Sequence, residues 1–393
     1  MSTLNTTVLG INFENPFILA SAPPTAKIES IDKAFSLGWG GAVLKTITPD
    51  NLEMIEASQR YATWKVGGKV CGFENIELLS HLTIQQWLDG IKYLKQKHPT
   101  KVQIASIMAP VIKEEWQKLV LTFNNSEVDA FELNFSCPHG MPEKGIGMAI
   151  GTDPEISAKI TKWVMEVAKK PVFVKLSPNV TNIVEIAKAV ETAGADGFAA
   201  INTVQSLMGI DLDTFEPKPK VNGKTTYGGY SGMSIKPIGL RCVAQIRQNS
   251  NLPILGMGGV STWSDAAEYM CVGADIVQVC TEVMINGYAI IKSLKQGLLT
   301  YLENKGLNSP ADLKNKAISS LSTHEALNKQ KKSYPHVNDA LCIKCGKCVT
   351  ICDESEHSAL SITDGKVIVD TDKCVGCSLC SHVCPKLTIT MKV

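Results

Sequence analysis

The spacing of the cysteines constrains this chain more than any other feature of its sequence. Eight of the 13 cysteines form two runs near the C-terminus, each with the pattern Cys-x2-Cys-x2-Cys-x3-Cys. The runs are Cys342, Cys345, Cys348, Cys352 and Cys374, Cys377, Cys380, Cys384. Thiolates at this spacing ligate [4Fe-4S] clusters, with the fourth cysteine of each run on the other cluster. The sequence therefore predicts a small domain that holds two clusters and moves single electrons.

Crossed ligation assigns four thiolates to each cluster. We expect one cluster on Cys342, Cys345, Cys348 and Cys384, and the other on Cys352, Cys374, Cys377 and Cys380. Structural zinc favours two separated Cys-x2-Cys pairs, and disulfide frameworks are typical of short secreted chains, so both alternatives fit less well. The first run has Asp353 where the second has Pro385, a difference that removes no ligand.

The residues before these runs have the pattern of a larger fold. Short apolar segments alternate with stretches of helical periodicity, as expected for buried parallel strands joined by helices. The eight strand-like segments are 17–20, 42–45, 102–107, 130–134, 172–175, 197–202, 253–256 and 276–279. The length suits one (β/α)8 barrel of about 250 residues or somewhat more. We expect a barrel over 1–310, a linker over 311–335 and the two-cluster domain over 336–393.

Charge and composition exclude several classes of function. The net charge is +1 and the sequence pI about 7.5, so the chain lacks the basic footprint of a nucleic-acid or anionic-membrane binder. The lysine-containing segment 329–332 is either merely solvated or a docking site for a partner.

The N-terminus resembles no signal peptide, and no apolar stretch is long enough to span a membrane. We therefore expect a cytoplasmic protein, in keeping with oxygen-sensitive clusters.

Polar residues follow the predicted strands at the face where barrel enzymes build their sites. They are Lys45 and Thr46, Asn134 and Ser136, Lys175, Asn202 and Thr203, Gly258 and Gly259, and Cys280 and Thr281. The glycines after the seventh strand and the turn after the eighth indicate a phosphate cradle. The two lysines would stabilise negative charge on a reduced flavin ring. FMN fits both features and the clusters, because a flavin takes up a hydride and passes electrons on singly.

Three segments carry a resemblance to a known family. They are 133–141, with the sequence LNFSCPHGM, 225–232, with TTYGGYSG, and 73–78, with FENIEL. With the barrel and the clusters, they resemble the dihydroorotate and dihydropyrimidine dehydrogenases, the latter in particular. The resemblance implies flavin contacts from Ala20, Ser21, Lys45, Thr46, Lys175, Gly232, Gly258, Gly259, Cys280 and Thr281. It implies pyrimidine contacts from Asn75, Asn134, Ser136, Asn202 and Thr203, and a general acid/base role for Cys137.

The chemistry of pyrimidine reduction agrees with these roles. A hydride and a proton must reach neighbouring ring carbons from opposite faces, so a flavin on one face requires a proton donor on the other. A cysteine, with an ordinary pKa of about 8.5, suits that task near neutrality. Carboxamides match the alternating N–H and C=O groups of uracil. We expect Cys71, Cys242 and Cys271 to pack as small hydrophobes, His139 to shape its loop, and Cys280 to contribute its backbone.

A glycine-rich segment over 145–151 resembles a dinucleotide fingerprint but has the wrong spacing. We expect it to belong to a lid that carries Cys137. Because no other dinucleotide site is visible, electrons must be exchanged with a separate subunit that binds FAD and NAD(P). The resemblance favours NAD(H) as its nicotinamide and implies a homodimer or heterotetramer.

Two alternatives remain at the level of the sequence. A dihydroorotate dehydrogenase would need a cation or extra donors for the ring carboxylate of its substrate. An electron-transfer flavoprotein without a substrate of its own would have no use for Asn75, Asn134, Asn202 and Cys137 together.

Overall fold

The computed structural model describes residues 2–52, 55–136 and 146–393. The chain divides into two compact units, Met1–Ser320 and Leu321–Val393, each of which is described by itself below.

The first unit is a closed barrel of eight parallel strands, in the order β10-β13-β14-β3-β4-β7-β8-β9. The strands are β3 (Phe17–Leu19), β4 (Gly41–Val43), β7 (Val102–Ile107), β8 (Ala130–Asn134), β9 (Val172–Leu176), β10 (Gly197–Ala200), β13 (Ile254–Met257) and β14 (Ile276–Val279). Each of the eight apolar segments overlaps one of these strands, and all the strand residues are buried. The predicted (β/α)8 barrel is therefore confirmed.

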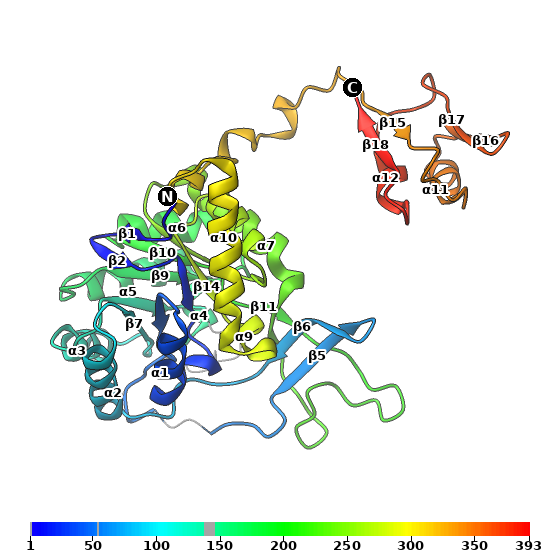
Figure 1. The fold of residues 1–393 in the computed structure, drawn as a ribbon. Coiled ribbons are helices and arrows are strands. Elements are labelled where there is room, and N and C mark those ends of the chain that lie inside the picture. The colour runs from blue at the N-terminus through cyan, green and yellow to red at the C-terminus, as the bar shows by residue number, and fades with distance from the viewer. Residues whose placement is uncertain (1, 53–54, 137–145) are drawn as a thin grey trace. The chain divides into compact units, whose positions relative to one another are not determined.

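Helices surround the strands (Figure 1). They are α1 (Ile28–Leu37), α2 (Ile84–Lys97), α3 (Lys113–Asn124), α5 (Pro154–Met165), α6 (Ile183–Thr192), α7 (Lys236–Asn249), α8 (Trp263–Cys271) and α10 (Ile291–Lys305). Helix α2 begins with a capping box of Thr83 and Gln86 and buries Trp87, Ile91 and Leu94 on one face. Burial of each such side chain contributes about 1.5–3 kcal/mol, so packing rather than local propensity stabilises these helices.

Two helix-to-strand joints show how the chain returns to the barrel. After α6, Gly194 adopts a φ of +101°, and after α8, Gly273 adopts a φ of +113°, conformations that a glycine adopts without strain. The carboxylates of Asp196 and Asp275 then accept hydrogen bonds from the amides of Val172 and Ile254, at 2.9 Å each. Each aspartate thus fixes the start of a neighbouring strand.

A hairpin that the sequence did not reveal precedes the barrel. Strand β1 (Thr6–Val8) pairs with β2 (Ile11–Phe13), and Val8 and Phe13 join the apolar side chains that fill the barrel interior. Phe13 is 1% exposed, because it packs where the barrel strands begin. The opposite end, where the strands terminate, is left for a site.

A second sheet adjoins that opposite end. It has the order β11-β12-β6-β5 and consists of β5 (Tyr61–Val66), β6 (Lys69–Asn75), β11 (Val204–Ser206) and β12 (Gly228–Ser231). These strands come from the excursions that follow β4 and β10. Their pairing places Asn75 opposite Gly229, which brings the FENIEL segment to the strand ends.

Shorter elements complete the first unit, which extends to Ser320. They are α4 (Met148–Gly151), α9 (Thr281–Asn286) and the 3-10 helices η1 (Pro23–Thr25), η3 (Met233–Ile235), η4 (Tyr288–Ile290), η5 (Pro310–Leu313) and η6 (Ile318–Ser320). Leu313 is buried and Lys314 pairs with Asp275 at 2.5 Å, so the first part of the expected linker packs on the barrel.

The second unit contains two similar halves. Strand β15 (Tyr334–Val337) pairs with β18 (Ile389–Lys392), and β16 (Leu360–Thr363) pairs with β17 (Lys366–Val369). Helices α11 (Lys347–Glu354) and α12 (Leu379–Val383) each begin within one cysteine run, and η7 (His324–Ala326) precedes the sheet. Its small core contains Cys348, Leu360, Cys380 and Ile389. A core this small leaves much of the stability to whatever the cysteines bind.

Candidate active site and cluster sites

One pocket of about 1050 Å³ lies at the strand ends of the barrel. Its lining includes all ten residues that the sequence predicts as flavin contacts, together with Asn75, Asn134, Asn202 and Thr203. Ser136 does not line the pocket directly but lies behind it, as described below.

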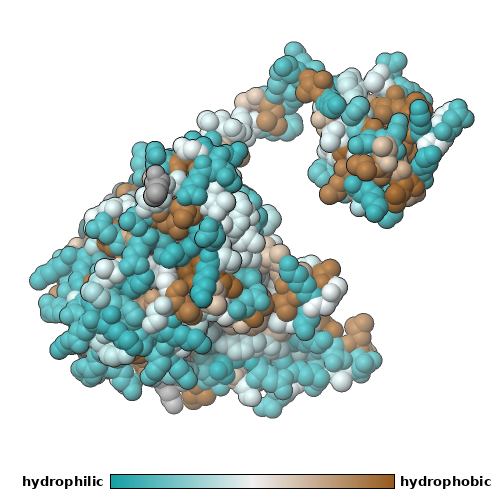
Figure 2. All heavy atoms as spheres, in the orientation of Figure 1, coloured by the Kyte–Doolittle hydropathy of each residue, from teal (hydrophilic) through white to brown (hydrophobic). Residues whose placement is uncertain are grey.

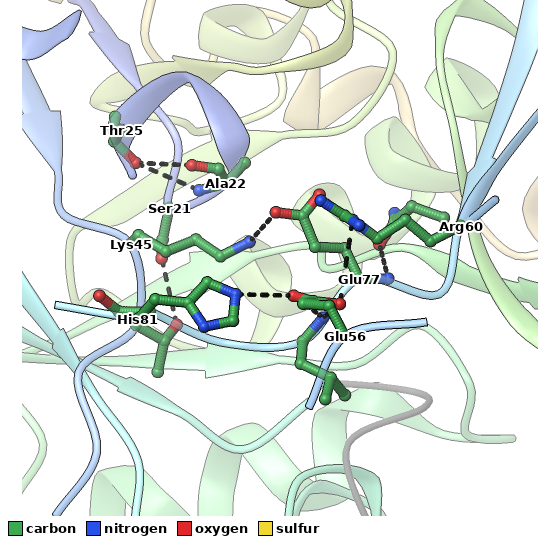
Figure 3. Close-up of polar contacts among 12 residues, drawn as sticks. Ser21, Ala22, Thr25, Lys45, Glu56, Arg60, Glu77 and His81 are labelled. Carbon is green, nitrogen blue, oxygen red and sulfur yellow. Dashed lines mark hydrogen bonds and ion pairs between the residues drawn. The ribbon is translucent and has the colours of Figure 1, made fainter. Parts of the chain in front are cut away.

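The first predicted lysine, Lys45, is held by a carboxylate. Its Nζ donates to Glu77 Oε1 at 2.9 Å, and both side chains are nearly buried. Glu77 also pairs with Arg60 at 3.9 Å, Arg60 with Glu56 at 3.9 Å, and Glu56 with His81 at 3.5 Å. Figure 3 shows this chain of alternating charges leading away from Lys45.

Glu77 is a pocket residue that the sequence reasoning missed. The signal was present, because Glu77 stands two positions after Asn75 in the segment that carries the family resemblance. Its backbone amide donates to Asn75 Oδ1 at 3.4 Å, while Asn75 Nδ2 donates to the Gly229 carbonyl at 3.2 Å. The segment therefore presents a carboxamide and a carboxylate to the same pocket in a fixed arrangement.

The second predicted lysine, Lys175, is also paired, deeper in the barrel. Its Nζ lies 3.4 Å from Glu132 Oε1, and Gln278 Nε2 donates to Glu132 Oε2 at 2.9 Å. Lys175 is 4% exposed and Glu132 is fully buried. A lone buried carboxylate is costly, so this pairing is what permits Glu132 to lie inside the barrel. Glu132 and Gln278 are further members of the site that the sequence reasoning did not select.

Small polar side chains connect the strand ends. Thr46 Oγ1 accepts from Asn134 Nδ2 at 2.9 Å and lies 3.1 Å from Ser21 Oγ. Asn202 Nδ2 donates to Ser136 Oγ at 2.8 Å, which explains how Ser136 supports the pocket without lining it. Three predicted substrate carboxamides, Asn75, Asn134 and Asn202, are thus oriented by the protein in advance. Cys137, His139 and the rest of 137–145 lie outside the described residues.

The glycines of the predicted phosphate cradle lie where a side chain could not. Gly258 has a φ of +121° and Gly259 of +71°, and a Cβ on Gly259 would come within 2.7 Å of the Lys236 amide nitrogen and 2.8 Å of the Gly232 carbonyl oxygen. Thr281 Oγ1 donates to Ser231 Oγ at 2.8 Å beside them. Glycines at such a place let a phosphate approach the backbone amides closely, so the residues present fit FMN.

Cys280 differs from a reactive thiol. Burial raises its pKa to about 11, although the neighbouring Lys175 and Lys45 act in the opposite direction. The thiol is therefore neutral near pH 7, which agrees with a backbone role. Burial also raises the pKa of Cys242 and Cys271. The described part of the glycine-rich segment packs inward, since Ile146 and Ile150 are fully buried.

A second buried carboxyl lies beside the pocket. Glu74 on β6 is fully buried and accepts a hydrogen bond from the Gly228 amide at 3.1 Å. Burial is the largest cause that raises its pKa, to about 7. Glu74 therefore changes protonation near neutrality and joins β6 to the first residue of β12.

In the second unit, the cysteines surround two cavities. One cavity, of about 370 Å³, is lined by Cys342, Cys345, Cys348 and Cys384. The other, of about 340 Å³, is lined by Cys352, Cys374, Cys377 and Cys380. The chain thus brings together the two sets that crossed ligation requires. Among the described residues, no group of three or more His, Cys, Asp or Glu is arranged around a single metal ion.

The fold and the two kinds of site define an iron–sulfur flavoprotein oxidoreductase. Comparison with known families agrees: residues 3–302 match the dihydroorotate dehydrogenase model, and 335–391 match the 4Fe-4S dicluster domain. The chain belongs to the dihydroorotate dehydrogenase family, and it carries a two-cluster domain in addition.

Three relatives illustrate the range of this family. The chain is 37% identical to the NAD-dependent dihydropyrimidine dehydrogenase subunit PreA of Escherichia coli, over 97% of this chain and 93% of the relative. It is 36% identical to the chloroplastic dihydropyrimidine dehydrogenase (NADP(+)) of Arabidopsis thaliana, over 84% and 80%. It is 36% identical to the catalytic subunit of dihydroorotate dehydrogenase B (NAD(+)) of Pyrococcus furiosus, over 78% and 96%. Within the described residues, no helix is long and apolar enough to cross a membrane.

Proposed function

We propose that this chain is the catalytic subunit of a dihydropyrimidine dehydrogenase. It interconverts uracil or thymine with the 5,6-dihydro ring and exchanges the electrons, through two [4Fe-4S] clusters, with a separate subunit that binds FAD and NAD(H). The observation that carries the proposal is the combination of one pocket lined by three carboxamides with two cavities each lined by four cysteines. The similarity to the Escherichia coli and Arabidopsis relatives supports the same substrate class.

The residues of the pocket divide the work. Bound FMN supplies hydride transfer to and from the pyrimidine. Lys45 and Lys175 place positive charge in the pocket, and Asn75, Asn134 and Asn202 offer paired donors and acceptors to a flat ring. Cys137, the proposed acid/base, follows Ser136 in the sequence, and Ser136 Oγ accepts a hydrogen bond from Asn202 Nδ2.

Charge in the pocket favours a neutral substrate over dihydroorotate. In the part of the chain that the structure describes, the lysines that line the pocket are Lys45 and Lys175, and each is already paired with a carboxylate. A substrate carboxylate would have to compete with Glu77 or Glu132 for its cation. Uracil makes no such demand, because it carries no charge at neutral pH.

Anaerobic reduction of the bound flavin tests the substrate. Dihydrouracil should bleach the flavin absorbance of the purified chain, while dihydroorotate and buffer should not. With a strong artificial electron donor the chain alone should reduce uracil, and NADH or NADPH should support that reaction only after the FAD-binding subunit is added. Bleaching by dihydroorotate alone would overturn the substrate proposal, and NADH-dependent activity of the isolated chain would overturn the need for a partner.

A further inference from the structure

The two cluster cavities differ in charge. The cavity of Cys342, Cys345, Cys348 and Cys384 is also lined by three lysines, Lys344, Lys347 and Lys386, and by no acidic residue. The cavity of the other four cysteines is lined by no Lys, Arg, Asp or Glu, and its one further titratable residue is His357. We refer to Lys344, Lys347 and Lys386 as the lysine patch.

The near-repeat of the two cysteine runs shows what stands at the corresponding positions of the other half. Lys344 corresponds to Gly376, Lys347 to Leu379, and Lys386 to Glu354, because each holds the same place relative to its ligating cysteines. The same local fold therefore exists in this chain with and without the three lysines. The positive charge is not a requirement for building a cysteine-lined cavity.

Lys344 occupies a backbone conformation that favours glycine. Its φ is +55°, and its counterpart Gly376 has a φ of +75°. A residue with a Cβ is strained in this left-handed region, whereas glycine is not. Lys344 therefore keeps its side chain at a cost in backbone strain, whereas a Cβ on Gly376 would also come within 2.8 Å of the Ser333 carbonyl oxygen.

The lysine patch is free within its unit. All three side chains belong to exposed residues, and among the described residues of the unit the one ion pair joins Lys373 to Asp370. The Lys344 ammonium lies close to Gly365 in the turn between β16 and β17, where it meets no carboxylate within ion-pair distance. Three unpaired lysines at one cavity add positive charge around the anionic, thiolate-ligated cluster expected there, and an acidic surface would complement these lysines.

Exposed apolar residues accompany these charges. Leu387 is 78% exposed, Leu341 62% and Ile343 55%. Ile343 lines the lysine-bearing cavity, and Leu341 and Leu387 are neighbours in sequence of residues that line it. Figure 2 shows apolar atoms at the surface of the C-terminal unit among hydrophilic ones. Exposed apolar side chains surrounded by charges of one sign are typical of interfaces that form and dissociate.

We propose that the lysine patch, with Ile343 and Leu387, is the surface on which the FAD-binding partner subunit docks through an acidic face. This inference rests on the proposed function, because it assumes the partner. Electrons then pass between the partner and this chain through the cluster of Cys342, Cys345, Cys348 and Cys384. The cluster gains one electron for each that the partner's flavin loses, no bond is formed or broken in the transfer, and NADH oxidised by the partner is the source of the pair.

Charge reversal with a matched control tests the docking surface. The triple variant Lys344→Glu, Lys347→Glu, Lys386→Glu should weaken binding of the purified partner subunit by about 10-fold or more at low salt and reverse the salt dependence of binding, because salt then screens a repulsion. The control, Lys329→Glu, Lys331→Glu, Lys332→Glu, makes the same change in net charge in the exposed segment before β15 and should bind within about two-fold of the parent. Equal losses in both variants, or no loss in the first, would overturn the proposal.

A second variant uses the chain's own repeat to avoid misfolding. Lys344→Gly, Lys347→Leu, Lys386→Glu converts the patch to the residues of the other half, which already fold around four cysteines. Lys344→Gly alone should leave the thermal stability of the cluster-loaded protein unchanged or higher. The same variant should bind the partner subunit more weakly. Lower stability of that single variant, with partner affinity unchanged, would show that the lysine is structural.

A partner-free measurement separates this inference from the proposed function. The dithionite-reduced chain is reoxidised by ferricyanide, an anion, or by hexaammineruthenium(III), a cation. In the charge-reversed variant, reoxidation by ferricyanide should be about 10-fold slower at low salt, and reoxidation by the ruthenium complex should be faster. The control triple variant should change neither rate. Identical rates in all three proteins would overturn the proposed electron entry point. A chain whose flavin dihydrouracil fails to bleach would refute the proposed function and leave these rates interpretable.

Discussion

The lysines of the barrel pocket and those of the cluster-bearing unit differ in burial and in ion pairing. In the pocket, Lys45 and Lys175 are buried and each is paired with a carboxylate of the same chain. In the C-terminal unit, Lys344, Lys347 and Lys386 are exposed and meet no carboxylate among the described residues of that unit. Paired, buried charge is fixed in position and weakly screened by salt, whereas free surface charge acts on other molecules and is strongly screened.

This difference separates two tasks. A charge that orients a cofactor or a substrate must not move, and a buried partner prevents it from moving. A charge that attracts another protein must remain available until that protein arrives. Substitutions in the barrel should therefore change the chemistry of the isolated chain independently of salt, and substitutions in the C-terminal unit should change only exchange with other molecules.

The largest expected effect is confined to the barrel. Cys137→Ala should lower turnover by a factor of about 10² to 10⁴, the usual contribution of a positioned acid/base, and should leave flavin and clusters bound. Stopped-flow bleaching of the flavin by dihydrouracil should show the same loss without any partner present. Cys137→Ser should be nearly as damaging, because a hydroxyl is a much weaker acid. Near-parental turnover in Cys137→Ala would remove Cys137 from the chemistry.

Disabling the clusters should have the opposite result: electron exchange with the partner is lost, and the chemistry in the barrel remains. Cys377→Ala, or removal of 336–393, should reduce NADH-dependent uracil reduction in the presence of the partner by at least about 10-fold while the half-reaction of dihydrouracil with bound FMN remains. Steady-state rates of NADH-dependent uracil reduction and single-turnover bleaching of the flavin by dihydrouracil, measured on the same preparation, distinguish the two activities. Loss of both activities together would mean that the two units do not divide the work in this way.

A smaller effect concerns the flavin midpoint potential. Lys45→Met and Lys175→Met should each lower it by about 30 mV or more, equivalent to ~1.4 kcal/mol for a two-electron couple, because the anionic reduced ring loses a cation. Glu132→Gln should raise it, since Lys175 then keeps its full charge uncompensated. Lys314→Met, which breaks the Lys314–Asp275 pair, is the matched control and should leave it unchanged. Shifts of the same sign in Lys175→Met and Glu132→Gln would contradict the pairing argument.

The last effect is a pH dependence of stability at Glu74, which should leave the chemistry of both units unchanged. The pKa of Glu74 is about 7 in the folded protein against an ordinary 4.5. Its contribution to the free energy of unfolding is therefore fully present below pH 4.5 and is lost as the pH rises through 7, so that stability falls with increasing pH in this range. Glu74→Gln should flatten that slope and should be more stable than the parent at pH 8 by about 1–3 kcal/mol. Urea titrations at pH 5 and pH 8 measure this, with the exposed Glu29→Gln as control. An unchanged slope in Glu74→Gln would exclude Glu74 as its source.

Much of the fold was predictable because its signals are local. Buried parallel strands leave short apolar runs, and the cysteine spacing is set by the geometry of the cluster itself, so both survive in a single sequence. The β1–β2 hairpin was missed because its strands are three residues each and only the packing of Phe13 into the barrel justifies them. The sheet of β5, β6, β11 and β12 joins segments far apart in sequence, which no periodicity records.

The site was predictable at the strand ends but not in the partners behind them. Lys45 and Lys175 are visible because each follows an apolar run, whereas Glu77, Glu132 and Gln278 acquire their roles through tertiary contacts. Glu132 offered one signal, a charged residue between Phe131 and Leu133 inside a buried strand. The roles of the predicted contacts, Cys137 included, remain predictions for the experiments above.

The way in which the barrel closes bears on how the protein is made. Strand β3 pairs with β14, so that Phe17 lies beside Val277, and the earliest and latest strands of the barrel meet. During synthesis at the ribosome, the growing sheet therefore keeps two unpaired edges until almost the whole barrel has emerged. The cysteine runs are translated only after that closure becomes possible. Chain order therefore allows the barrel to close, and its aggregation-prone edges to pair, before the cluster ligands are made.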